Sequence, residues 1–262
     1  MESIIYVGID VHKDSYSVCS FDAKRNLLFS QTQMKSTPEN VARYLKKVSE
    51  MNNDALTVCG YEAGPTGFKL CRQLQKLGFA CVIIAPTSIA RTAKDKAVKT
   101  DRGDAQMLAK NLAFHSYRQV VLPSENIESI KEIVRLRSSA LKVCKRAKQN
   151  LLSFLLAHGF SYSDGKHWTI KFFSWLKTIH FDSEYLAYCF EEYLCEATRQ
   201  IQRLDLLDKK LKELENDEEI RDGVKNLKCI CGIDTIVAVG IAAEVGDFKR
   251  FKSAKDFASY TG

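Results

Sequence analysis

The residue pattern predicts an α/β protein in which a mixed β-sheet with helices on its faces is followed by a long helical segment. Short apolar runs rich in β-branched residues alternate with helical patterns up to about residue 122. Pro123 then marks a break, and two long apolar stripes at three- and four-residue spacing follow it. At 262 residues the chain exceeds one average domain and can bury a sizeable core.

Residues 1–122 are predicted to form the sheet domain. Three hairpin-like strands followed by strand–helix units favour a mixed sheet covered by helices. The expected elements, in chain order, are strands near 4–10, 16–22 and 27–34, a helix near 38–51, a strand near 55–62, a helix near 66–78, a strand near 80–85 and a helix near 103–115.

Residues 123–222 are predicted to form two long helices joined by an aromatic insert. The first apolar stripe runs from Ile127 to Leu155 and is interrupted by Arg137 and Lys148, and the second is interrupted by Asp208. The stripes can pack on each other within one chain or form a dimerising coiled coil, in which polar interruptions set the register. The insert mixes aromatic residues with Lys and His, which favours a local core over a surface that stacks on unpaired bases.

Residues 223–262 begin with a pattern similar to a helix-hairpin-helix. The turn at residues 232–234 separates a short apolar segment from a longer one that starts at Thr235. Such a motif holds DNA phosphates with backbone N–H groups at a helix N-terminus, although Asp234 stands where glycine is usual. Asp234 is at least as well explained as the N-cap of the second helix.

Four carboxylates at the ends of predicted elements are the candidate active-site residues. Asp10 lies in the first strand and Glu62 closes the fourth, while Asp101 and Asp104 stand three residues apart at the start of a helix. Acids at the carboxyl ends of strands face a crevice, and Mg²⁺ prefers oxygen ligands. Each acid alone could be an ordinary turn, cap or helix-start residue, but the joint pattern predicts a divalent metal site.

Four motifs carry a resemblance to a known family. They are residues 8–13 (GIDVHK), 61–67 (YEAGPTG), 100–105 (TDRGDA) and the run from Gly232 to Phe248. In this order, and over nearly the whole chain, they resemble the RuvC-like DEDD insertion-sequence transposases of the Piv/MooV (IS-one-ten) family, the bridge-RNA-guided recombinases.

The resemblance implies a ribonuclease-H-like (RuvC-like) catalytic domain over residues 1–122, a coiled-coil dimerisation segment over 123–222 and the start of a C-terminal transposase domain over 223–262. It implies a transposase or site-specific recombinase that cuts and rejoins DNA to mobilise an insertion sequence. Its partners would be donor and target DNA, a structured guide RNA, and further copies of the chain in a homodimer or higher oligomer.

The resemblance also assigns the chemistry. The catalytic, metal-binding acids would be Asp10, Glu62, Asp101 and Asp104, holding Mg²⁺ or Mn²⁺, with Asp10 bridging two ions. In the family, a serine after the element that corresponds to residues 258–262 becomes covalently linked to DNA. The nucleophile is therefore expected to be absent from this chain, and neither Ser253 nor Ser259 is taken for it.

The charge distribution suits a polyanionic partner. Residues 1–122 hold 17 basic and 11 acidic side chains, a net charge of +6 out of +7 for the whole chain. A solvated basic face is the simpler alternative. The predicted nucleic-acid contacts are Lys13, Arg91, Lys94, Lys96, Lys99, Arg102, Lys142, Lys145 and Arg146.

Composition excludes several other classes. The nine cysteines include no second Cys or His pair at zinc spacing, which indicates a reduced set without structural zinc. We find neither a signal peptide nor an 18-residue apolar span, so we expect a cytoplasmic protein of a bacterial or archaeal cell, acting at the nucleoid and away from membranes.

Three alternative functions compete with the transposase. A Holliday-junction resolvase-like endonuclease would use the same acids with water as the nucleophile. A non-catalytic nucleic-acid-binding regulator would need only the basic surface. A sugar-kinase or actin-like ATPase also begins with a strand and an Asp, but the residues after Asp10 lack the Gly/Ser/Thr-rich phosphate turn that this class requires.

Overall fold

The computed structural model describes residues 4–88 and 101–261. For Asp101 it describes the backbone but not the side chain. The chain divides into two compact units, Met1–Leu122 and Pro123–Gly262. The second unit contains both segments that the sequence separates at residue 222. Their separate roles stay a prediction.

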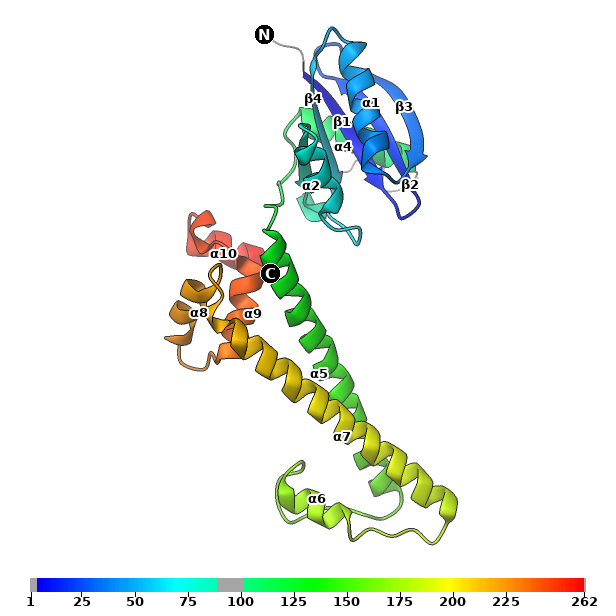
Figure 1. The fold of residues 1–262 in the computed structure, drawn as a ribbon, viewed down its shortest axis with the longest axis vertical. Helices are drawn as coiled ribbons and strands as arrows, with labels where there is room; N and C mark the ends of the chain where they lie inside the picture. Colours follow the sequence, from blue (N-terminus) through cyan, green and yellow to red (C-terminus); the bar gives the residue numbers. More distant parts are fainter. Residues whose placement is uncertain (1–3, 89–100, 262) are drawn as a thin grey trace. The chain divides into compact units, whose positions relative to one another are not determined.

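The first unit is built on a five-stranded mixed sheet with the order β3-β2-β1-β4-β5 (Figure 1). The first three strands pair antiparallel, and β1, β4 and β5 run parallel. The strands are β1 (Ile4–Val11), β2 (Ser15–Asp22), β3 (Leu27–Lys35), β4 (Leu56–Glu62) and β5 (Ala80–Ile84). This confirms the predicted mixed-sheet, ribonuclease-H-like fold class.

Among the described residues of this unit, three helices cover the two faces of the sheet. On one face, α1 (Pro38–Glu50) and α2 (Lys69–Lys76) bury Leu45 and Leu74 against Ile5, Val7 and Ile9. On the other, α4 (Asp101–Ala113) buries Leu108 and Leu112 against Ile84 and Tyr6. Alternate residues of β1 thus face different helices, as the two-residue period of a strand requires.

Two helix starts differ from the predicted ones. The helix expected from residue 66 begins at Lys69, because Gly64–Gly67 forms a hydrogen-bonded turn that ends with Gly67 at φ 67°. The helix expected from residue 103 begins at Asp101. Asp101 and Asp104 therefore both belong to the first turn of α4.

The second unit consists of helices. The elements are α5 (Glu125–Ala157), α6 (Ile170–Leu176), α7 (Glu184–Glu213), the short η2 (Leu214–Asn216), α8 (Arg221–Lys228), α9 (Thr235–Val245), η3 (Phe248–Arg250) and α10 (Ala254–Thr261). Ala238, Val239 and Ala242 of α9 bury themselves against the start of α5 and the end of α7. The Asp234 side chain accepts a hydrogen bond from the Val237 N–H at 2.8 Å, which supports its interpretation as an N-cap.

The two long helices, α5 and α7, pack on each other within one chain. Arg137 and Asp208, which interrupt the two apolar stripes, meet across this contact with Nε and Oδ1 2.7 Å apart. Both side chains are about one quarter exposed (24% and 25%). The intramolecular hairpin is thus the observed arrangement, and a coiled coil between subunits remains a prediction.

We expect this ion pair to couple the two helices energetically. Replacing Arg137 by Met should destabilise the hairpin by about 2 kcal/mol, because Asp208 loses its partner in a partly buried place. The double variant Arg137→Met/Asp208→Leu should recover much of that loss, since no lone charge remains. Urea unfolding of both single variants and the double variant measures the coupling; additive effects would show that the pair is not coupled.

The aromatic insert forms a local core at the other end of the hairpin. Phe172 and Leu176 are fully buried against Leu151 and Leu155 of α5. The Nζ of Lys148 lies 5.0 Å from the centre of the Trp168 ring, a cation–π contact. These contacts support the local-core interpretation of the insert. Within the described ranges, no helix has the length and apolar character to cross a bilayer.

Candidate metal centre

Asp10 and Glu62 lie at the same level, near the carboxyl ends of two neighbouring strands. In the parallel pair β1–β4, Ile9 stands opposite Tyr61, so Asp10 and Glu62 are the next residues on each strand. Neighbouring strands lie about 4.8 Å apart, which brings the two Cα atoms close together. Burial is intermediate for both residues.

Both acids lie on the sheet face that α4 covers. A Cβ on Gly8 would lie 2.1 Å from the Ala105 carbonyl oxygen, so β1 and α4 are in direct backbone contact there. Asp10 follows Gly8 by two residues and therefore shares its face. Glu62 stands opposite Ile84 of β5, which packs on Leu108 of α4.

The first turn of α4 points to the same end of the sheet. Phe114, just past the C-terminal end of α4, contacts Phe21, with the ring centres 5.8 Å apart, and Phe21 is paired with Tyr6 near the start of β1. Ala105, near the beginning of the helix, lies at Gly8. The N-terminal end of α4 therefore lies toward the Asp10 end of β1.

The backbone thus brings three of the predicted segments together at the carboxyl ends of β1 and β4. The side chain of Asp101 lies outside the described residues. Among the side chains that are described, no three His, Cys, Asp or Glu groups gather closely enough to hold a metal ion. The donor set is nevertheless of the carboxylate kind that Mg²⁺ and Mn²⁺ use, and like charges at one edge of a sheet favour a cation between them.

His12 is a site residue that the sequence analysis missed. Its Nε2 donates a hydrogen bond to Oδ2 of Asp10 at 3.0 Å, with the imidazole half exposed and the carboxylate 19% exposed. The available signal was the spacing, since residues two apart on an extended chain point to the same side. His12 therefore helps to orient the carboxylate of Asp10.

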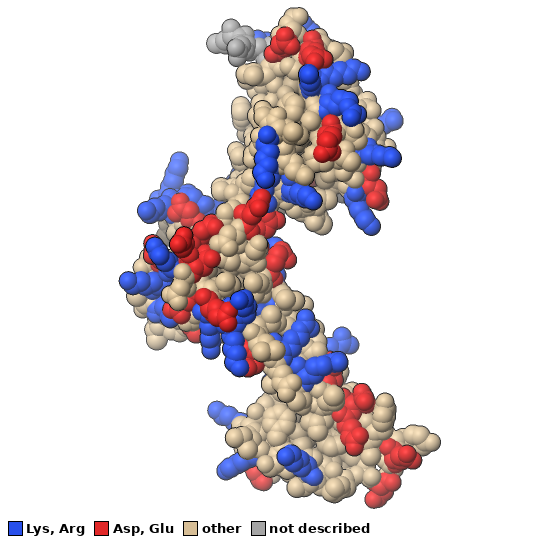
Figure 2. Space-filling view, in the orientation of Figure 1, with Lys and Arg blue, Asp and Glu red and all other residues tan. Residues whose placement is uncertain are grey.

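The predicted nucleic-acid contacts fall into three groups. Lys13 and Arg102 are exposed on the first unit, beside Asp10 and in the first turn of α4. Lys142, Lys145 and Arg146 are exposed on α5. Figure 2 shows Lys and Arg side chains standing among Asp and Glu over the visible face rather than in one continuous basic field. The remaining four, Arg91, Lys94, Lys96 and Lys99, lie outside the described residues.

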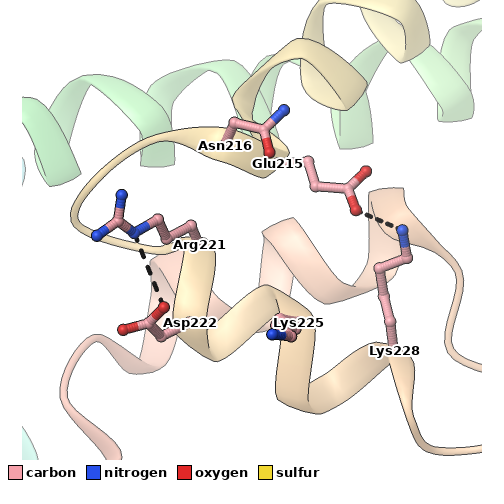
Figure 3. A pocket seen from close by; sticks show the side chains of 6 residues that line it. All are labelled: Glu215, Asn216, Arg221, Asp222, Lys225 and Lys228. Atoms are coloured by element: carbon pink, nitrogen blue, oxygen red, sulfur yellow. Dashed lines mark hydrogen bonds and ion pairs between the residues drawn. The ribbon is translucent and has the colours of Figure 1, made fainter.

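A pocket of about 360 Å³ lies in the second unit between η2 and α8 (Figure 3). Its lining residues are Glu215, Asn216, Arg221, Asp222, Lys225 and Lys228. Lys228 pairs with Glu215 and lowers the pKa of that carboxyl, and Arg221 pairs with Asp222 at 3.8 Å. Because two of the three cations are already neutralised by acids of the same pocket, its attraction for an anion is weak.

Comparison with known proteins gives two family matches. A family model for DEDD transposases of the IS110 type, described as a transposase, matches residues 7–159. A second model, described as the transposase IS116/IS110/IS902 family, matches residues 224–262.

Individual relatives agree with these matches. The transposase for insertion sequence element IS1533 of Leptospira borgpetersenii is 32% identical over 259 residues, which cover 97% of this chain and 73% of that protein. The putative transposase y4qE of Sinorhizobium fredii is 31% identical over 258 residues, 98% of this chain and 62% of that protein. The chain thus spans less than two thirds of the second relative.

Among solved structures, T. thermophilus RuvC in complex with Holliday junction substrate aligns with a TM-score of 0.33 and 12% identity. The alignment covers 45% of this chain and 99% of that one.

Proposed function

Because the chain belongs to the IS110 family of transposases, we propose that it contributes a metal-dependent acidic site to cutting and rejoining the DNA of an insertion sequence. The proposal rests above all on the register of Asp10 and Glu62, which lie at the carboxyl ends of adjacent strands on the face covered by α4. The start of that helix supplies Asp101 and Asp104 at the same edge.

In this proposal, the four carboxylates hold Mg²⁺ or Mn²⁺. A divalent ion bound there stabilises the charge that develops on a phosphodiester as it is cleaved. Asp10 would be one of the metal ligands, and the 3.0 Å hydrogen bond from His12 would keep its carboxylate oriented for that role. Lys13 and Arg102, exposed beside the acids, hold the phosphates that flank the scissile one.

The partners follow from the proposed reaction. We propose that the chain binds donor and target DNA, that a structured RNA guides the choice of target, and that the active assembly is a homodimer or a higher oligomer. The covalent step in the family manner needs a serine. The guide RNA and the serine step are proposed from the family resemblance.

Cleavage of branched and linear DNA, assayed with Mg²⁺ and with EDTA, tests this function. We expect cleavage in Mg²⁺ only. Because the family's serine is expected to be absent from this chain, free ends, with water as the nucleophile as in a junction resolvase, are the expected product. A covalent protein–DNA adduct would show instead that this chain supplies a nucleophile of its own. DNA binding without any cleavage, in the presence of the guide RNA and metal, would contradict the proposal and favour a regulator.

The salt dependence of DNA binding should report on residues 91–99. If at least two of Arg91, Lys94, Lys96 and Lys99 contact phosphates, replacing all four by Ala should flatten the plot of log affinity against log salt by about 1.8. Fluorescence anisotropy with labelled duplex DNA measures the slope. The matched control replaces four exposed lysines of α1 and α2: Lys46, Lys47, Lys69 and Lys76. An equal slope in both variants would refute the contact.

A further inference from the structure

The edge strand β3 contains a β-bulge next to the proposed metal centre. Residues 15–18 of β2 pair with 35–32 of β3, but Ser20 pairs with Phe29, so Ser30 and Gln31 together stand opposite Cys19. Ser30 has φ 49°, the left-handed conformation that marks the first residue of such a bulge. The bulge changes which side chains of β3 point to which face of the sheet.

As a consequence, side chains of β3 on the two sides of the bulge point to different faces of the sheet. Phe29 packs into the core beneath α1, on the same face as its partner Ser20. Gln31 instead points to the α4 face. Without the extra residue at Ser30, a regular two-residue alternation would put Phe29 and Gln31 on one face.

Gln31 is tied to the start of α4 by both ends of its amide. Its Nε2 donates to the Arg102 carbonyl oxygen at 3.0 Å, and its Oε1 accepts from Nε2 of Gln106 at 2.8 Å. Arg102 lies between Asp101 and Asp104 in the first turn. The turn that carries two of the proposed metal ligands is therefore attached to an edge strand that carries none of them.

The bulge itself is held by Tyr44 of α1. The Tyr44 hydroxyl donates to the Ser30 carbonyl oxygen at 2.6 Å, and the fully buried Ser20 lies 2.7 Å from the same hydroxyl. Since the tyrosine proton goes to Ser30, the Ser20 hydroxyl donates to Tyr44. Burial raises the pKa of Tyr44 to about 12, so the phenol stays protonated and keeps donating.

We propose that Gln31 is a positioning residue for the metal centre: supported by the bulge at Ser30 and by Tyr44, it holds the first turn of α4 at the distance from Asp10 and Glu62 that metal binding requires. This inference rests on the proposed function of the four acids. It assigns a role to the edge strand β3, which lies outside the motifs of the family resemblance.

The test compares Gln31→Met with Gln33→Met in the full chain. Methionine keeps the length of the side chain and removes the amide. Gln33 is an equally exposed residue of β3 that donates to Ser15 Oγ on β2 at 3.0 Å, which makes it the matched control. Two measurements are needed: Mn²⁺ affinity by titration calorimetry, and hydrogen exchange of the amides of residues 105–109 in α4.

For Gln31→Met we expect about tenfold weaker Mn²⁺ binding, the lower end of what outer partners of metal ligands contribute, and faster exchange at the start of α4. Gln33→Met should match the wild type in both measurements. Tyr44→Phe should give a smaller effect of the same kind. Because Tyr44 acts through Gln31, adding Tyr44→Phe to Gln31→Met should not speed the exchange of α4 further.

The outcomes separate this inference from the proposed function. If Gln31→Met and Gln33→Met behave alike in both measurements, the positioning role is overturned. If the wild type binds no Mn²⁺ but Gln31→Met still speeds exchange in α4, the proposed metal centre fails while Gln31 is upheld as the anchor of the helix. If the metal binds and only thermal stability changes, Gln31 is structural and the inference is wrong.

Discussion

Replacing Asp10 by asparagine is expected to weaken Mn²⁺ binding by about 100-fold or more and to abolish metal-dependent cleavage, while the sheet stays folded. Changes in the partners of metal ligands alone cost about 10- to 100-fold in affinity, and Asp10 is proposed as a direct ligand. Asparagine has the same size but no charge, so packing on the α4 face changes little. Titration calorimetry and thermal unfolding of the same samples measure both effects.

Asp14→Asn is the matched control for this prediction. Asp14 is an exposed carboxylate in the turn between β1 and β2, four residues after Asp10 in the same hairpin. The Asp14→Asn variant removes one negative charge from the same region, so it shows any general electrostatic effect on cation binding too. Equal Mn²⁺ affinities for the two variants would mean that Asp10 is not a ligand.

Gly8→Ala should have the largest effect on stability. The new Cβ would lie 2.1 Å from the Ala105 carbonyl oxygen and 2.5 Å from the Ala109 nitrogen, both backbone atoms of α4 that cannot move aside alone. The helix must shift as a body, at a cost of about 3 kcal/mol or more, which corresponds to a fall of about 10 °C or more in the unfolding midpoint. The shift also moves the first turn of α4 away from Asp10, so Mn²⁺ binding should weaken in the protein that remains folded.

Gly64→Ala controls for the loss of a glycine as such. Among the described atoms, a Cβ there would meet the Glu62 carbonyl oxygen alone, at 3.9 Å, which is an ordinary contact. We expect a change below about 1 kcal/mol. Should Gly8→Ala unfold at the same temperature as Gly64→Ala, the close approach of β1 and α4 would be wrong.

The positions and the ends of the strands are the part of the fold that the sequence predicts well. The apolar, β-branched runs before Asp10 and Glu62 are typical of strands that are covered on both faces, and the turn at Gly64–Gly67 stops the second run. Helix starts are less certain, because the same glycines delay α2 to Lys69. The sequence does not predict the ion pair between Arg137 and Asp208, because apolar stripes indicate that a helix packs but not which helix it packs on.

The residues that support the acids cannot be predicted from sequence patterns. The bulge at Ser30 has no sequence signal, because serine is not a typical left-handed residue and the conformation depends on Tyr44 from another element. The contact of Gln31 with Arg102 joins residues 71 positions apart. Propensity and periodicity describe one element at a time, so contacts between elements appear only in the folded chain.

Anomalous diffraction at the manganese edge, from crystals grown in Mn²⁺, tests most directly whether the acids of β1, β4 and α4 form one metal centre. We predict a peak at about 2.1 Å from carboxylate oxygens of Asp10 and Glu62, with Asp101 or Asp104 completing the ligands. A well-ordered sheet with manganese bound elsewhere would contradict the proposed site. So would a well-ordered sheet in which these carboxylates point away from one another and hold no ion.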